Sequence, residues 1–176
     1  VKKIPFTVLE KSVEQVDAVR RFGSKIYYGD AARLELLRAA HAAQARILVI
    51  SISRVDTSLK LAESVRNHFP KLRIFAVAND RNHALRLMDL GIKDVIRRAY
   101  FSSLEMGRRL LLALGEREDA AQRAIDTFHQ HDEATLLRQQ TVFRDEQELI
   151  QTAQEAAREL GQLFQSDRSE KWPATT

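Results

Sequence analysis

The 176-residue sequence contains no cysteine, which excludes disulfide bonds, thiol catalysis and cysteine-ligated metal sites. It has only three prolines and six glycines, and nowhere do the glycines take the G-x-G-x-x-G spacing that cradles a dinucleotide pyrophosphate. A G-x-S-x-G nucleophile motif is also missing, so nothing in the sequence argues for an enzyme. No apolar run reaches the roughly 18–20 residues of a membrane-spanning helix, and the composition favours a soluble segment.

Charge is abundant but not concentrated. Lys and Arg number 28 against 24 Asp and Glu, giving a formal charge of +4, and the excess is spread along the chain. A nucleic-acid-binding domain would usually gather its basic residues on one face, so no nucleic-acid partner is expected. None of the five histidines forms the i, i+4 pair with an acid that is typical of a helical zinc site, and no metal site is expected.

Up to Gly115, short apolar runs alternate with longer amphipathic stretches. Strands are predicted at residues 6–9, 25–28, 46–50, 73–77 and 94–96, and helices at 12–22, 34–43, 57–69, 81–90 and 100–114. The alternation predicts an α/β fold with a Rossmann-like open parallel sheet. The 46–50 segment is the most hydrophobic and is expected to lie centrally in that sheet.

From Glu116 to about Gln165 the sequence contains no proline and one glycine, and it is rich in good helix formers. A long helical tail is expected there, with an irregular end from Ser166 onward. The predicted domains are therefore 1–115 and 116–176. Because so little sequence precedes the strand that ends near Glu10, the Rossmann-like sheet is expected to lack the usual first βα unit, or to receive it from another segment.

Candidate ligand-binding residues lie at predicted strand ends, where open α/β sheets bind ligands. Glu10 follows the first strand and is suited to accept hydrogen bonds from ribose hydroxyls, although a helix-start carboxylate is an equally good interpretation. Gly29, Asp30 and Ala31 form a turn that could meet an adenosine, or Asp30 could simply cap the next helix. Ser51 and Ser53 could face a ribose or phosphate, but a hydroxyl-capped turn is the more common arrangement.

Several short motifs occur in a characteristic order: Thr7–Glu10, Tyr27–Ala31, Leu34–Ala40, His68–Pro70, Leu90–Ile92 and Phe101–Arg108. In this order, and with the helical tail, the chain resembles the nucleotide-binding domain of glutathione-gated potassium-efflux antiporters of the KefB and KefC type, the KefB branch being nearer. The resemblance covers nearly the whole chain.

The resemblance implies a regulatory domain that forms a homodimer beneath the membrane antiporter domain of the same protein, at the cytoplasmic face of the bacterial inner membrane. It implies a bound nucleotide, AMP or NAD(H), and gating by glutathione and its adducts, with a flavin-fold ancillary subunit as a further partner. By position, Glu10 would hold the ribose, and Gly29, Asp30 and Ala31 would line the adenosine side. Arg97 and Asp132 would contact glutathione, and KefC-type members carry an asparagine in place of Asp132.

Three other interpretations remain open at this stage. A regulatory subunit for potassium uptake or for a channel would share the same nucleotide-binding class, but it would usually carry a small α/β module after the first domain. A Rossmann-class oxidoreductase would require a glycine loop and a catalytic domain. A truncated fragment without ligand binding would expose a strand edge.

Overall fold

The computed structural model describes residues 4–21 and 26–169. The predicted helix end at Gly23 and the strand start at Lys25 lie outside the described residues, as does the chain beyond Ser169. The chain divides into two compact units, and strands β4 and β5 each contribute residues to both. The predicted domain boundary near Gly115 stays a prediction.

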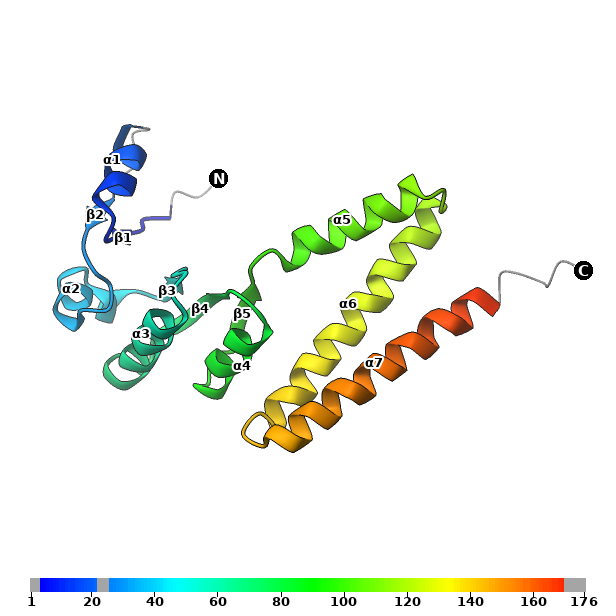
Figure 1. The fold of residues 1–176 in the computed structure, drawn as a ribbon. Helices are drawn as coiled ribbons and strands as arrows, with labels where there is room; N and C mark the ends of the chain where they lie inside the picture. The colour runs from blue at the N-terminus through cyan, green and yellow to red at the C-terminus, as the bar shows by residue number, and fades with distance from the viewer. Residues whose placement is uncertain (1–3, 22–25, 170–176) are drawn as a thin grey trace, which may run out of the picture. The chain divides into compact units, whose positions relative to one another are not determined.

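The first unit comprises residues 1–77 and 92–94. Its elements are β1 (Leu9–Glu10), α1 (Val13–Arg21), β2 (Tyr27–Tyr28), α2 (Leu34–Ala39), the 3-10 turn η1 (Ala42–Gln44), β3 (Ile47–Ile50), α3 (Val55–His68) and the greater part of β4 (Arg73–Ala78). Figure 1 shows α1 linking β1 to β2 and α3 lying between β3 and β4 along the chain. The predicted 34–43 helix breaks at Ala40, because His41 adopts a left-handed conformation with φ of 58°.

The second unit comprises residues 78–91 and 95–176. It contains α4 (Arg81–Asp89), the greater part of β5 (Asp94–Arg97), α5 (Tyr100–Ala113), α6 (Glu118–Thr141) and α7 (Glu146–Ser169). The long helix α6 packs against α4, α5 and α7. In Figure 1, α6 and α7 run side by side as a helical hairpin. The predicted tail is therefore two helices, and α7 continues past residue 166, where an irregular end was predicted.

The described strands form two parallel sheets rather than one. β1 pairs with β2, with Leu9 opposite Tyr27 and Glu10 opposite Tyr28. The second sheet has the order β3-β4-β5. The prediction that the 46–50 strand lies centrally is wrong for this sheet, because β3 is at its edge and β4 is in the middle. Val49 on β3 is accordingly 65% exposed, although its sequence is typical of a strand buried on both faces.

Helix ends follow local rules. Gly115 ends α5 with φ of 94°, and its N–H donates to the Leu112 carbonyl while the N–H of Glu116 donates to that of Leu111. This is the paired hydrogen bonding of a Schellman motif, which favours glycine. Asp145 begins α7, because its Oδ1 accepts from the N–H groups of Gln147 and Glu148. In the part of the chain that the structure describes, no helix combines the length and apolar character that a membrane crossing requires.

Candidate ligand-binding site

In the first unit, the ends of β1 and β2 bring Glu10 and Gly29 together. The N–H of Gly29 donates to the carbonyl of Glu10 over 2.9 Å, directly beyond the Glu10–Tyr28 pair. Because the strands are parallel, their carboxyl ends share one edge. The predicted ribose residue and the predicted adenosine turn are therefore neighbours.

Both carboxylates at this edge also close local turns. Glu10 Oε1 accepts from the N–H of Ser12 over 2.8 Å, at the start of α1. Asp30 Oδ1 accepts from the N–H of Ala32 over 3.0 Å, while the α2 N-cap is Arg33, without a side-chain capping bond. Asp30 thus forms a turn before the helix rather than capping it.

The surroundings of three predicted ligand-binding residues, Gly29, Ser51 and Ser53, are also defined in the structure. A Cβ on Gly29 would lie 3.1 Å from Cδ1 of Leu36, so tight packing favours glycine there whether or not a ligand approaches. Ser51 and Ser53 lie at exposed positions after β3, and the N-cap residue of α3 is Arg54.

In the second unit, Arg97 and Asp132 are in direct contact. Arg97 is the last residue of β5, and Asp132 lies midway along α6; their side chains are 10% and 12% exposed. One oxygen of Asp132 is paired with Arg97 and the other with Arg81, which begins α4. Two guanidinium groups therefore hold the two oxygens of one carboxylate. We call Arg81, Arg97 and Asp132 the arginine clamp.

Three other side chains hold the two arginines of the clamp in place. Tyr100 lies beneath Arg97, with the guanidinium carbon 3.7 Å from the ring centre, a cation–π contact. Glu133 also pairs with Arg97, over 3.0 Å. Arg81 donates from Nη1 to Oε1 of the buried Gln139 over 2.8 Å.

These contacts shift the acid–base properties of the cluster. Burial by itself would raise the pKa of Asp132, but the hydrogen bond from Arg97 and the charges of Arg81 and Arg97 outweigh it and hold that pKa below its usual value. Burial likewise opposes the charge on Arg97, yet the hydrogen bond to Asp132 keeps its pKa raised. Burial and the Asp132 charge raise the pKa of Tyr100 to about 12. At neutral pH, Asp132 is therefore an anion and Arg97 a cation, beside the neutral phenol of Tyr100.

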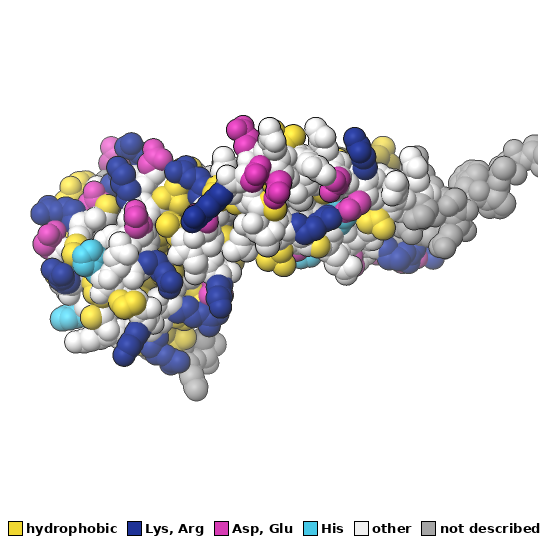
Figure 2. Space-filling view, turned by 90° about the horizontal axis from the view of Figure 1, so that it is seen from below, with side chains coloured by type: hydrophobic (Ala, Val, Ile, Leu, Met, Phe, Trp, Pro, Cys, Tyr) yellow, Lys and Arg dark blue, Asp and Glu magenta, His cyan; other side chains and the backbone are white. Residues whose placement is uncertain are grey.

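Two other arginines near Arg97 in the sequence, Arg98 and Arg108, make separate contacts. Arg108 pairs with Glu105 and Glu118 on the exposed side of α5 and α6, and Arg98 donates to Oδ1 of Asn79. Basic and acidic side chains lie intermixed on the face shown in Figure 2. The cluster around Arg108 is a solvated ion-pair network rather than part of the clamp.

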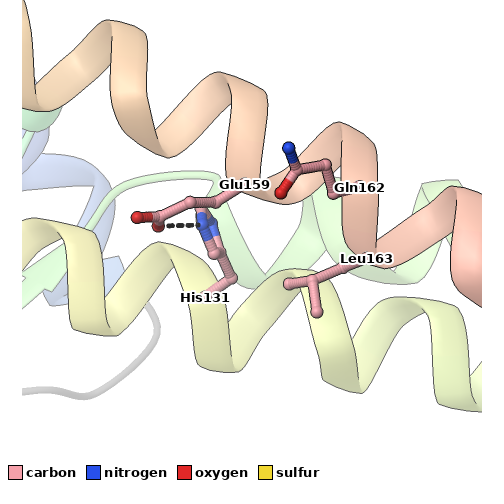
Figure 3. A pocket seen from close by; sticks show the side chains of 4 residues that line it. All are labelled: His131, Glu159, Gln162 and Leu163. Carbon is pink, nitrogen blue, oxygen red and sulfur yellow. Dashed lines mark hydrogen bonds and ion pairs between the residues drawn. The ribbon is translucent and has the colours of Figure 1, made fainter.

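A hollow of about 450 Å³ lies between α6 and α7, lined by His131, Glu159, Gln162 and Leu163. Figure 3 shows His131 Nε2 facing Glu159, 3.3 Å from its Oε2. Arg138 also donates to Glu159 over 2.7 Å and, as the largest cause, lowers the pKa of that carboxyl to about 2. His131 and Glu159 pair with each other across the two helices, so this hollow makes a weaker candidate site than the clamp.

Comparison with known proteins identifies the family of the chain. A family model described as the TrkA-N domain matches residues 1–98, and one described as the potassium efflux system KefB C-terminal domain matches residues 102–175. The C-terminal domain of Kef from Shewanella denitrificans, solved in an AMP-bound form, is 38% identical over 77% of this chain and 83% of that chain, with a TM-score of 0.69. The chain belongs to the Kef-type TrkA-N family.

More distant structures agree with this family. The TrkA-N domain of the inner membrane protein ybaL from Escherichia coli is 26% identical, over 64% of this chain and 80% of that one, with a TM-score of 0.52. The GsuK RCK domain is 22% identical, over 64% of this chain and 24% of that one, with a TM-score of 0.57, which shows a shared fold alone. The Kef-type chain is thus a regulatory domain of a potassium efflux system, from families that are regulatory rather than catalytic.

Sequence analysis did not predict Arg81, Tyr100 or Gln139 as residues of a ligand-binding site. A usable signal existed for two of them. Arg81 follows β4 and Tyr100 follows β5, the same strand-end positions that drew attention to Glu10 and Asp30. Gln139 lies one helical repeat of seven residues from Asp132, so the two share a face of α6.

Proposed function

We propose that this chain is the ligand-sensing part of a Kef-type potassium/proton antiporter, binding an adenosine nucleotide at the Glu10–Gly29–Asp30 edge and glutathione at the arginine clamp. The observation that carries the nucleotide proposal is the meeting of Glu10, Gly29 and Asp30 at the carboxyl ends of two paired parallel strands. Open α/β sheets bind ligands at this edge, and the related Shewanella denitrificans domain was solved with AMP. The proposed nucleotide is AMP or NAD(H).

Glutathione is the proposed second ligand because the clamp is built for carboxylates. Planar guanidinium groups bind carboxylates through paired, charge-assisted hydrogen bonds, and glutathione carries two carboxylates. The proposed regulation is by differential affinity: glutathione binds one state of the domain better, and an adduct on its sulfur favours the other. The domain would act as a homodimer attached to the membrane antiporter domain, with a flavin-fold ancillary subunit as a further partner, and it would have no catalytic role of its own.

The experiment is calorimetric titration of the chain with AMP and with NADH, compared with Asp30→Asn. Asparagine keeps the Oδ1 acceptor for the N–H of Ala32, so the turn survives while the charge is removed. Loss of a hydrogen bond to a charged group predicts binding weaker by about tenfold or more. Glu63→Gln, an exposed carboxylate on α3, is the matched control and should bind as the unsubstituted chain does.

Two results would count against the proposal. If the chain binds neither nucleotide while melting cooperatively, it has no nucleotide site of its own. If Asp30→Asn and Glu63→Gln bind equally well, the nucleotide lies elsewhere than at the Glu10–Asp30 edge.

A further inference from the structure

The clamp holds an internal carboxylate in the way that it would hold a ligand. Arg81 and Arg97 each take one oxygen of Asp132, and both Arg97 and Asp132 are largely buried. Each pairing is a charge-assisted contact of the kind that an arginine also makes with a free carboxylate. The anion-binding capacity of the two arginines is therefore already used by a residue of the chain itself.

The two arginines have supports that do not depend on Asp132. Arg97 rests on the Tyr100 ring, 3.7 Å from its centre, and pairs with Glu133 over 3.0 Å. Arg81 is tied to Gln139, which is only 5% exposed. Removing the Asp132 charge should therefore leave both guanidinium groups close to their present positions, facing an unoccupied place for a carboxylate.

The charge balance supports the same conclusion. Two cations, Arg81 and Arg97, face two anions, Asp132 and Glu133, so the cluster is neutral. A neutral cluster has no net attraction for an anionic ligand. Without the Asp132 charge the cluster would carry +1, and Arg97 within it is only 10% exposed.

We propose that Asp132 is an internal competitor that occupies the arginine clamp, so that a free carboxylate binds there only by displacing it. Asp132 then sets the affinity and charge preference of the site, and an uncharged residue at this position makes the site more open to anions. Taking glutathione as the carboxylate concerned rests on the proposed function; the occupation of the clamp does not.

The first test needs no knowledge of the natural ligand. Thermal unfolding of the chain, of Asp132→Asn and of Asp132→Ala is followed in sodium glutarate and in sodium chloride at equal ionic strength. The melting temperature of the unsubstituted chain should be the same in both salts. Each variant should melt several degrees higher in glutarate than in chloride, because the free dicarboxylate fills the vacated clamp.

Asp89→Asn is the matched control, since Asp89 forms a two-bond pair with Arg144 at an exposed place on α4. It should melt equally in both salts. Variants of Asp132 that melt alike in glutarate and chloride overturn the proposal. So does a variant that stays unfolded in both, because Tyr100 and Gln139 would then not hold the arginines as argued. A variant that folds in sodium glutarate but not in sodium chloride supports the proposal.

The second test uses glutathione and separates this inference from the proposed function. Asp132→Asn should bind glutathione at least tenfold more tightly than the unsubstituted chain, and glutathione diethyl ester, which lacks free carboxylates, should show no such gain. If neither chain binds glutathione but glutarate still stabilises the variants, the clamp proposal stands and the glutathione assignment fails. If Asp132→Asn binds glutathione more weakly, glutathione remains the ligand and the competitor role of Asp132 is wrong.

Discussion

At the scale of single residues, His83 in the first turn of α4 is buried with 1% of its surface exposed. Its Nδ1 accepts from the N–H of Asn79 over 3.1 Å, which requires the proton of the neutral ring to sit on Nε2. Its own N–H donates to Oδ1 of Asp80, the cap of α4. Burial, as the largest cause, lowers the pKa of His83 from 6.5, only partly opposed by the charge of Asp80.

A pH dependence of stability follows. The unfolded chain binds a proton at His83 near pH 6.5, whereas the folded chain resists it, so the stabilisation is present above that pH and is lost as pH falls toward the lower folded pKa. The slope attributable to one proton is about 1.4 kcal/mol per pH unit. The free energy of unfolding, measured with urea between pH 7.5 and pH 5, should fall as the pH is lowered. The substitution His83→Asn, which keeps an acceptor for Asn79, should remove the part of this pH dependence that is due to His83. The control is His68→Asn, at an exposed position, which should leave the pH dependence unchanged.

Residues were predictable where a local pattern carried the information. Arg97 and Asp132 were carried over by position from the family that the ordered motifs resemble, and the structure places them in contact. Their partners could not be found in this way, because the contact of Arg81 with Asp132 joins positions 51 residues apart. Such a contact depends on how α4 packs on α6, which no local propensity encodes.

At the scale of elements, the turn from β5 into α5 is unusual. Ala99 has φ of 61° and ψ of −7°, in the left-handed region that non-glycine residues seldom adopt. Its carbonyl accepts from the N–H of Ser103 and from the hydroxyl of Ser102. The turn separates Arg97 from Tyr100 by two residues and lets the ring lie against the guanidinium group. Backbone strain of this kind is concentrated at functional sites.

Ala99→Gly should therefore stabilise the chain, by up to about 1 kcal/mol, because glycine adopts positive φ without the Cβ penalty. Ala134→Gly, at an exposed position inside α6, serves as the contrast and should destabilise by about 1 kcal/mol. Chemical denaturation of the two variants measures both effects. Destabilisation by both substitutions would mean that the Ala99 conformation is not strained in solution.

The order and type of the elements were predictable, because each segment has a clear hydrophobic periodicity and clear boundary residues. The position of β3 within its sheet was not predictable. Its apolar sequence predicts a strand but not the place of that strand in the sheet, because strand order depends on contacts between distant segments. Ile47 and Val49 remain exposed in the three-stranded sheet.

At the scale of the whole molecule, α5 bears on the proposed homodimer. Met106, Leu110 and Leu114 recur every four residues along this helix, and all three are exposed, Leu114 by 82%. None of the α5 residues is buried within the chain. A continuous apolar stripe of this kind is typical of a surface that packs on another protein. In the homodimer proposed above, a second copy of the chain would pack on this stripe.

Leu110→Glu should then weaken self-association by at least about tenfold, since it places a charge in the middle of an apolar contact. Sedimentation equilibrium would measure the dissociation constant, and circular dichroism would show that the helices remain. Leu137→Glu is the control, because Leu137 is also exposed but lies on α6, outside the stripe. If both substitutions dissociate the dimer equally, the interface is not on α5. If the unsubstituted chain is a monomer at every concentration tested, the stripe covers a different partner, and glutathione sensing at the clamp would have to work within one subunit.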